Sequence, residues 1–407
     1  MVNVSNVPAS RDDAVRLDKI DPLRRFRDAF DLPEGVIYLD GNSLGPPPRS
    51  ALAALQKTAE EDWGQGLIRS WNDAGWFDLP STCGAKIANL IGAAPSEVIV
   101  ADSVSINIFK LTAALLNVHR GAVAVFDNEF PTDAYILQGL ASLTGADLRM
   151  LAQGDDPFAG GIGVLVMSAV DYRTADVIDI AMMEKRAAAA NVAIIWDLSH
   201  ATGLLPLNLC RDGARFAVGC GYKYLNGGPG APAFLYASED APPLTQPLSG
   251  WMGHATPFDF VTDYRPADGA RRFACGTPPI LSLSALDAAL DIFNDVNMED
   301  VRAKSQQLGD LFLSRALSAG LETVSPMPGK PRGGHVSLRF AHGYEVVQAL
   351  IARGVIGDFR GPDLMRFGFS PLYLSYADIW DAAEALIDIL QTEDWRRPEH
   401  AHRAKVT

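Results

Sequence analysis

The sequence lacks the features that mark membrane, secreted and metal- or disulfide-stabilised proteins. It has no run of about 18 or more apolar residues, the length that a membrane-spanning helix requires. Its four cysteines form no Cys-x-x-Cys pair, so neither a zinc knuckle nor a disulfide framework is indicated; they are Cys83, Cys210, Cys220 and Cys275. The first residues contain no apolar segment of a secretory signal. These absences predict a soluble, cytoplasmic protein without a bound metal.

Positive charge is also scarce. The chain has 35 Lys and Arg against 49 Asp and Glu, a formal net charge of −14. This balance argues against a nucleic-acid partner, which needs a basic face to meet its phosphates, but leaves room for a local cationic pocket. The 407 residues, 48% of them hydrophobic, are enough for two domains with a large core.

The most informative stretch lies in the middle of the chain. An apolar run from Val192 to Trp196 predicts a strand buried on both faces, and it ends on Asp197, with His200 three residues later. A carboxylate at the C-terminal end of such a strand lies where open α/β sheets bind ligands. Lys223 follows a second apolar stretch, where burial favours the neutral amine that a Schiff base needs. A buried ion pair between the acid and the lysine is the simpler alternative.

Apolar runs alternate with helical patterns along the rest of the chain, which predicts a largely parallel sheet with helices on both sides. The expected strands are Val36–Asp40, Val98–Val100, Ala122–Phe126, Leu148–Leu151, Val164–Met167 and Phe216–Cys220. The expected helices include Arg49–Trp63, Ser81–Ile91, one from about Thr132, Met183–Ala190 and Met298–Ala319.

Two short motifs invite chemical interpretation. Gly41 to Gly45 satisfies Gly-x-Ser-x-Gly, the nucleophile elbow of serine hydrolases, but the elbow needs a helix starting at Ser43, and three prolines follow directly. A hydrolase acting through Ser43 without a cofactor is therefore disfavoured. Val104 and Ser105 open a predicted helix, whose free amides suit a phosphate, although Ser105 is equally explained as an N-cap.

Taken together, the motifs resemble a known family. W-D-x-x-H ending at His200 and Y-K-Y-x-x-x-G-x-G around Lys223 look like the pyridoxal phosphate (PLP) site of fold-type-I enzymes, specifically kynureninases. The resemblance extends from Y-L-D-G-N-S-L-G near the N-terminus through F-P-T-D to R-F-G-F-S-P-L-Y near the C-terminus. It implies an α/β fold: a large domain with a mostly parallel sheet between helices, plus a smaller C-terminal α+β domain. We expect an N-terminal segment at 1–60 near the small domain and active site, a large PLP-binding domain at 61–290 and a small domain at 291–407.

The resemblance also implies the catalytic residues. Lys223 would carry PLP as a Schiff base, Asp197 would pair with the pyridinium nitrogen, and Tyr222 would bond the phosphate and relay protons. Further cofactor contacts are expected from Val104, Ser105, Phe130, Asp133, Ser168, His200, Trp251 and Thr277. Phe130 would stack on the ring, a favourable arrangement for an aromatic side chain. Asp133 is also explained as an acid in the first turn of a helix.

Substrate contacts and assembly follow from the same resemblance. Arg366 would bind the substrate α-carboxylate, with a structural salt bridge as the alternative, and Asn42 and Trp71 would line the substrate pocket. Trp251 and Thr277 lie on a loop that in this fold usually reaches the phosphate of the partner subunit. A homodimer with shared active sites is therefore expected, although Trp251 could simply pack in the interface.

The implied reaction is hydrolysis of L-kynurenine to anthranilate and L-alanine in tryptophan catabolism, the kynurenine pathway that leads to NAD biosynthesis. The sequence does not decide between kynurenine and 3-hydroxykynurenine. Another fold-type-I enzyme, such as a cysteine desulfurase or an aminotransferase, is the alternative. A desulfurase needs a mobile nucleophilic cysteine; Cys275 lies in the expected phosphate loop, and no other cysteine is an obvious candidate.

Overall fold

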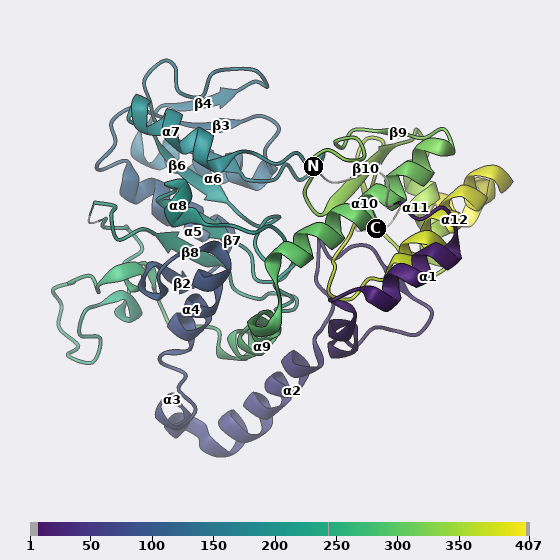
Figure 1. Cartoon of the computed structure of the whole chain (residues 1–407). Helices are drawn as coiled ribbons and strands as arrows, with labels where there is room; N and C mark the ends of the chain where they lie inside the picture. Colours follow the sequence, from purple (N-terminus) through teal and green to yellow (C-terminus); the bar gives the residue numbers. More distant parts are fainter. Residues whose placement is uncertain (1–6, 243, 404–407) are drawn as a thin grey trace.

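A seven-stranded sheet forms the centre of the computed structural model, which describes residues 7–242 and 244–403 (Figure 1). The strand order is β2-β8-β7-β6-β5-β3-β4, and the strands are β2 (Val98–Val100), β3 (Ala122–Phe126), β4 (Leu148–Leu151), β5 (Ile162–Ser168), β6 (Ala193–Asp197), β7 (Phe216–Gly219) and β8 (Phe234–Ala237). Strands β3 to β7 run parallel, and only β8 is antiparallel to its neighbours. The predicted largely parallel sheet is confirmed, with strand ends within two residues of those expected.

Helices cover both faces of this sheet, which is why its strands are apolar along their whole length. On β5, Leu165 and Met167 join a core that includes α4 (Leu79–Ile91), α7 (Ile180–Ala190) and α9 (Ile280–Leu290). Val164 and Val166 face the other way, into a core with α5 (Val104–Leu115) and α6 (Pro131–Thr144). Successive residues of a strand point to opposite faces, so a strand covered on both sides needs apolar residues at every position.

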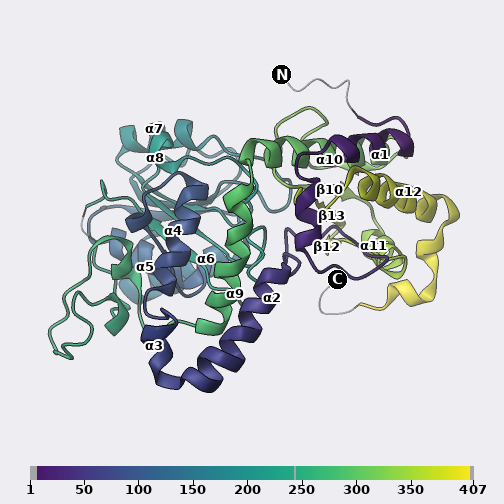
Figure 2. The ribbon, with the colours of Figure 1, turned by 60° about the horizontal axis from the view of Figure 1, so that its bottom comes forward.

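The C-terminal part has its own, antiparallel sheet in the order β12-β13-β10-β9. Its strands are β9 (Glu322–Thr323), β10 (His335–Arg339), β12 (Asp358–Arg360) and β13 (Leu364–Gly368), and its helices are α10 (Met298–Ser318), α11 (Gly343–Ala352) and α12 (Tyr376–Thr392). Helix α10 runs from the central part of the molecule across to this sheet (Figures 1 and 2). In the register of β12 and β13, Asp358 lies opposite Arg366.

The N-terminal segment belongs spatially with the C-terminal part. Helix α1 (Arg11–Ile20) packs on α12, and β1 (Ile37–Tyr38) pairs in parallel with β11 (Val355–Ile356). The turn that follows β1 also contacts the central part, because Gly45 N donates to the Tyr222 carbonyl at 2.7 Å. A Cβ on Gly45 would lie 2.2 Å from the Lys223 carbonyl oxygen, so only glycine permits this approach. Residues 1–6 of the expected N-terminal segment and 404–407 of the expected small domain lie outside the described residues.

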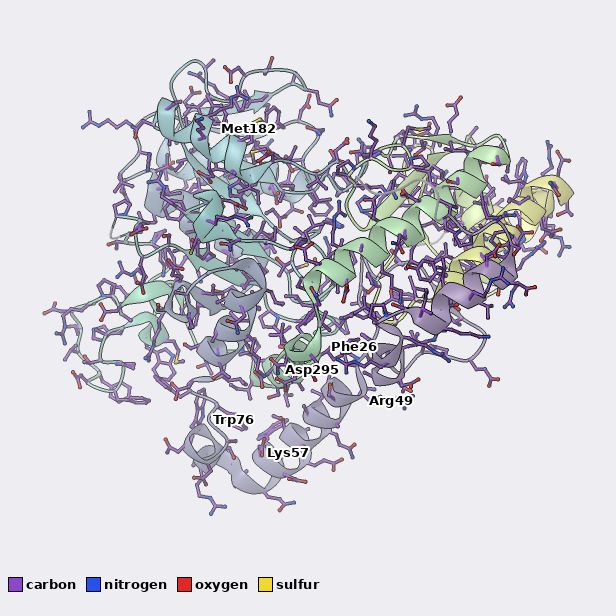
Figure 3. The ribbon with its side chains drawn as sticks, viewed as in Figure 1. Phe26, Arg49, Lys57, Trp76, Met182 and Asp295 are labelled. Carbon is purple, nitrogen blue, oxygen red and sulfur yellow. The ribbon has the colours of Figure 1, made fainter. Side chains whose placement is uncertain are left out.

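The helical segment that carries Arg49 and Lys57 projects away from the central sheet (Figure 3). The predicted helix at Arg49–Trp63 is partly wrong, because the regular helix α2 (Arg49–Lys57) ends at Lys57 and the winding widens to a π-helix over Thr58–Gly66. Helix α3 (Ser70–Asp73) and the short helix α8 (Leu209–Asp212) complete the α-helices of the described residues. Short 3₁₀ helices lie at Arg24–Ala29, Leu67–Arg69, Pro95–Glu97, Trp251–Gly253, Gly269–Phe273, Asp291–Asp295, Asp394–Arg396 and Pro398–Ala401. Among the described residues, no helix has both the length and the apolarity needed to cross a membrane.

Candidate active site

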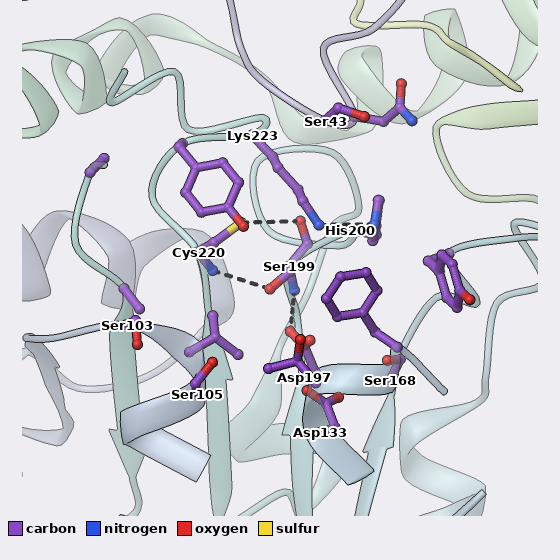
Figure 4. Close-up of a pocket in the computed structure, with 18 of the residues that line it drawn as sticks. Ser43, Ser103, Ser105, Asp133, Ser168, Asp197, Ser199, His200, Cys220 and Lys223 are labelled. Carbon is purple, nitrogen blue, oxygen red and sulfur yellow. Dashed lines mark hydrogen bonds between the residues drawn. The ribbon is translucent and has the colours of Figure 1, made fainter. Parts of the chain in front are cut away.

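A cavity of about 340 Å³ lies where the central sheet, the C-terminal sheet and the N-terminal turn meet (Figure 4). The ends of the parallel strands contribute Ser168 and Asp197, which places the cavity at the sheet edge where open α/β folds bind ligands. Eleven of the residues predicted from the sequence line it: Asn42, Val104, Ser105, Phe130, Asp133, Ser168, Asp197, His200, Tyr222, Lys223 and Arg366.

Asp197 and Lys223, the pair on which the sequence analysis depends, line the same cavity. Asp197 is the last residue of β6, and its Oδ1 accepts a hydrogen bond of 2.8 Å from Ser199 N. Its Oδ2 accepts none from the described residues, which leaves this oxygen available to a ligand. Lys223 Nζ lies 3.0 Å from His200 Nε2 rather than against Asp197, so the simple ion-pair alternative is not what the structure contains.

The imidazole of His200 is fully enclosed. Burial, together with the nearby charge of Lys223, holds the pKa of His200 well below its usual value, so the ring is neutral at physiological pH. With its proton on Nδ1, the ring presents Nε2 as an acceptor to the Lys223 amine. His200 Nδ1 is buried and has no hydrogen-bond partner among the described residues.

Three carboxyl groups, those of Glu129, Asp133 and Asp197, lie close together near the ends of β5 and β6. Burial, and next the negative charge of Asp197, raises the pKa of Asp133 to about 9, and burial raises the pKa of Glu129 to about 7. Glu129 Oε1 accepts from Ser168 N at 2.9 Å and so ties the end of β5 to the loop before α6. Near neutral pH Asp133 is therefore protonated and adds no negative charge beside Asp197, while its buried Oδ2 lacks a partner among the described residues.

The aromatic wall is provided by Phe130. Its ring meets that of Tyr172 edge to face at 5.4 Å and 89°, and the side chain keeps 44% of its surface exposed beside the cavity. Phe130 is held there because α6 begins at Pro131, whose fixed φ suits the first position of a helix. An exposed aromatic face suits stacking against a flat conjugated ring.

The start of α5 forms another wall. Ser103, not Ser105, is the N-cap of this helix, since its Oγ accepts from Ile106 N at 3.4 Å. The alternative explanation of Ser105 as the N-cap is therefore wrong. The Ser105 hydroxyl has no partner among the described residues, and the first amides of the helix have no intrahelical acceptor. These groups, with the positive end of the helix dipole, suit a phosphate.

The N-terminal turn brings an unsatisfied amide into the cavity. Asn42 is completely buried, and neither its Oδ1 nor its Nδ2 has a hydrogen-bond partner among the described residues. Gly368 of β13 leaves room for it, because a Cβ there would lie 2.0 Å from Asn42 Oδ1. Buried polar groups are nearly always paired, so Asn42 is suited to bind a polar group of a ligand.

Arg366 is a cation already in contact with a carboxylate. It is 2% exposed, and its Nε and Nη2 donate to Asp358 Oδ1 and Oδ2 at 2.8 and 2.6 Å. The salt-bridge alternative is therefore present, although Arg366 also lines the cavity. Ser43 Oγ accepts from Arg366 Nη2 at 2.9 Å and lies in a turn, with no histidine as its partner among the described residues, so it lacks the surroundings of a hydrolase nucleophile.

Three predicted site residues do not line the cavity of their own chain. Trp71 packs edge to face on Trp76 at 5.9 Å, and Trp251 packs edge to face on Phe258 at 5.9 Å. Thr277 lines a separate hollow of about 130 Å³.

Sequence reasoning missed several lining residues: Ser103, Thr132, Tyr172, Ser199, Cys220 and Arg360. A signal for Arg360 existed, because Asp358-x-Arg360 places an acid and a base on one face of a strand. Tyr172 lies in a loop with no periodic pattern, and the sequence held no comparable signal for it.

Comparisons with known proteins agree with these features. The family of kynureninase C-terminal domains matches residues 301–386. Curated kynureninases from Burkholderia mallei (strain SAVP1) and Pseudomonas fluorescens are 46% and 43% identical over 98% of this chain and 100% of their own. Among solved structures, a C-DES mutant with glycine covalently linked to its PLP cofactor has a TM-score of 0.78 at 19% identity, covering 89% of this chain and 99% of that one. The cysteine desulfurase CsdA from Escherichia coli has a TM-score of 0.75 at 19% identity, covering 91% and 98%.

Proposed function

The chain belongs to the kynureninase family, and from that premise we propose how its own residues divide the reaction among them. It is a PLP-dependent hydrolase with kynureninase activity, converting L-kynurenine to anthranilate and L-alanine. A cysteine desulfurase or aminotransferase activity is not favoured, because the relatives with high sequence identity are kynureninases, while the likeness to a cysteine desulfurase, at 19% identity, concerns the fold alone.

The cavity fits the cofactor. Bound PLP supplies an electron sink for the substrate Cα. We propose that the Lys223 amine holds it covalently, that Asp197 Oδ2 meets its ring nitrogen and that Phe130 stacks on its ring. The Ser105 hydroxyl and the amide of Val104 are proposed to bind its phosphate. The fit is supported by three sets of polar groups without hydrogen-bond partners among the described residues, which are Asp197 Oδ2, the Ser105 hydroxyl and the first amides of α5, and by the exposure of Phe130 beside the cavity.

Proton movement at the substrate Cα is assigned to Lys223. The Lys223 amine is proposed to be the base that takes the proton from Cα, and the neutral His200 ring, 3.0 Å away, accepts a hydrogen bond from that amine and orients it. Tyr222, which lines the cavity one residue earlier, is proposed to bond the phosphate and pass protons. Burial raises the pKa of Tyr222, so its hydroxyl keeps its proton and donates.

Orientation of the substrate is assigned to the side of the cavity formed by the N-terminal turn and the C-terminal sheet. Arg366 is proposed to bind the α-carboxylate, and the unsatisfied Asn42 amide a polar group of the substrate. Fixing the carboxylate sets which bond to Cα lies perpendicular to the ring plane, and alignment of this kind contributes strongly to rate. Trp71 lies outside the cavity of its own chain, so its proposed contact with the substrate ring needs the partner subunit.

The single observation that carries the proposal is that Asp197 and Lys223 of the central stretch line one cavity with Arg366 of the distant C-terminal sheet. The test is to add L-kynurenine to the purified holoenzyme and follow anthranilate fluorescence, with L-cysteine and sulfide release assayed in parallel. Anthranilate formation without sulfide is expected; sulfide release with kynurenine unchanged would contradict the proposal.

Asp197 and Asp133 should respond differently to the loss of a carboxyl. Asp197→Asn should lower kcat by about 10²-fold or more, because it removes the charge proposed to face the ring nitrogen. Asp133→Asn should lower kcat by less than about tenfold, because an amide replaces a carboxyl that is already neutral near pH 7. Steady-state kinetics at pH 7 measure both effects. An equal loss in the two variants would contradict the distinct roles.

We propose that the active sites are completed across a homodimer. The proposal is supported by exposed apolar side chains on the loop after Trp251: Phe258 at 62%, Phe260 at 80% and Val261 at 55%. Such a cluster favours a covered interface. It is supported as well by Trp251 and Thr277 lying apart from their own cavity, which suits contacts with the phosphate in the partner.

Shared sites can be detected by mixing defects. Lys223→Ala and Trp251→Ala chains, each of low activity alone, are co-expressed with different tags. If one site uses Lys223 of one chain and Trp251 of the other, each mixed dimer has one site with both changes and one with neither. With random pairing half of the dimers are mixed, so about a quarter of wild-type activity should return. Activity no higher than in the parent variants would argue that each site is built within one chain.

Three broader assignments complete the proposal. The division at 1–60, 61–290 and 291–407 is supported by the separate sheets and by the pairing of β1 with β11. A cytoplasmic enzyme of tryptophan catabolism, leading towards NAD biosynthesis, is the proposed setting, with a small molecule as substrate and neither nucleic acid nor membrane as partner.

A further inference from the structure

The hydrogen bonds of Arg366 leave it short of donors for a second carboxylate. A guanidinium has five N–H donors. Four of those of Arg366 are used: two on Asp358, one on Ser43 Oγ and one on the Tyr172 carbonyl, at 2.6 to 2.9 Å. One N–H, on Nη1, remains. A carboxylate is held in a fixed orientation by two donors, so a substrate carboxylate at Arg366 needs a second donor from another residue.

Arg360 has donors to spare at the same place. It lines the cavity with 38% of its side chain exposed. Its Nη2 contacts Asp358 Oδ2 at 2.7 Å and Ser43 Oγ at 3.4 Å, the two groups that Arg366 also contacts. Its Nε is buried without a partner among the described residues. Both of these contacts are made by Nη2, and Nε is buried, so the two N–H groups of Nη1 remain for a ligand.

The charges around the two arginines match one anion. Arg366 and Arg360 carry two positive charges, and Asp358, which is 2% exposed, offsets one. Asp40 lies nearby, but burial and the charge of Asp358 raise the pKa of Asp40 to about 7, so it is largely neutral below that pH. The neighbouring imidazoles of His200 and His335 are neutral as well. Below about pH 7 the cluster therefore keeps one uncompensated positive charge, the complement of a single carboxylate.

We propose that Arg360 is the second guanidinium of the substrate-carboxylate subsite, and that Asp358 is a positioning residue that holds both arginines in place. The inference rests on the proposed role of Arg366 and extends it. Asp358 lies opposite Arg366 in the register of β12 and β13, and two residues before Arg360 on the same face of β12. One carboxylate therefore sets the spacing of two cations from adjacent strands.

The test compares Arg360→Gln, Arg360→Lys, Arg366→Gln and Asp358→Asn with the wild-type holoenzyme. KM and kcat are measured for L-kynurenine and for its α-carboxamide, which lacks the negative charge, and the dissociation constant is measured for the product L-alanine. Arg360→Gln should raise KM and the L-alanine dissociation constant about tenfold, with kcat within about twofold, and the preference for the acid over the carboxamide should fall by the same factor. Arg360→Lys should recover part of that preference.

The control is Arg339→Gln, which removes an exposed arginine of the same sheet that pairs with Asp363; it should change none of these values.

Asp358→Asn separates positioning from charge. It should raise KM if Asp358 positions the arginines, and a lower KM, as expected from a simple gain of positive charge, would overturn that role. If Arg360→Gln leaves KM and the acid preference unchanged while Arg366→Gln alters them, the inference fails and the proposed function stands. If neither variant alters them, the proposed carboxylate site itself fails.

Discussion

Replacing Lys223 with Ala should abolish turnover of L-kynurenine, with a loss of at least about 10³-fold in kcat, because the variant lacks both the amine that holds the cofactor and the base at the substrate Cα. The side chain is half-buried and contacts only His200 by hydrogen bond among the described residues, so its removal should leave the fold intact. Anthranilate fluorescence measures turnover. The visible absorption of the protein reports whether the cofactor is still attached covalently.

The matched control is Lys185→Ala, which removes an exposed lysine from α7, a helix behind the sheet. That variant should keep wild-type kinetics and cofactor absorption. Substantial turnover by Lys223→Ala with the cofactor bound would remove Lys223 from the chemistry, and with it the main assignment of the site.

Replacing Arg366 with Ala should raise KM for L-kynurenine about 10²-fold or more, because truncation of one partner of a buried charge pair with a ligand commonly costs several kcal/mol. The absorption of the bound cofactor should be retained, since the proposed cofactor contacts lie on other elements. The change also leaves Asp358 with Arg360 as its sole cationic partner, so a loss of about 3 kcal/mol in stability is expected as well.

A second variant separates these two effects. Arg366→Ala combined with Asp358→Asn removes the buried carboxylate that has lost one of its two arginine partners, so the melting temperature should recover towards wild type while KM stays high. An unchanged KM in a folded Arg366→Ala protein would take Arg366 out of the carboxylate site. Recovery of KM in the double variant would mean that the single variant failed through misfolding near Asp358.

The sequence was most informative about features that depend on a single strand and on the residue at its end. The run before Asp197 predicted a doubly buried strand, and β6 has that burial at every residue, with the acid at its carboxyl end. Ser168 was assigned by resemblance, and it lies beside Asp197 because the ends of parallel strands meet at one edge of a sheet. The roles of Lys223, Phe130 and Asp133 were assigned by resemblance, and the structure brings these three residues to the same cavity.

The features that could not be predicted from the sequence depend on contacts between segments that are distant in the chain. The bond between Arg366 and Asp358 requires the register of two antiparallel strands, and the partner of Asp197 turned out to be a backbone amide rather than Lys223. Ser103 and Ser105 compete for the same capping position, and only the backbone geometry at Ser103 decides between them. Trp71, Trp251 and Thr277 were assigned to the site by resemblance, but they do not line the cavity of their own chain, and we propose that a partner subunit supplies them.

The pairing of β1 with β11 has a consequence for the order in which the enzyme is made. Ile37 lies beside Val355, more than three hundred residues later in the chain, and Gly368 N donates to the Leu39 carbonyl at 2.6 Å. During synthesis the central sheet can close while the first strand still lacks its neighbour. The wall that carries Asn42, Ser43 and the two arginines is therefore the last part of the cavity to form, because it needs the strands between Val355 and Gly368 as well as the first strand.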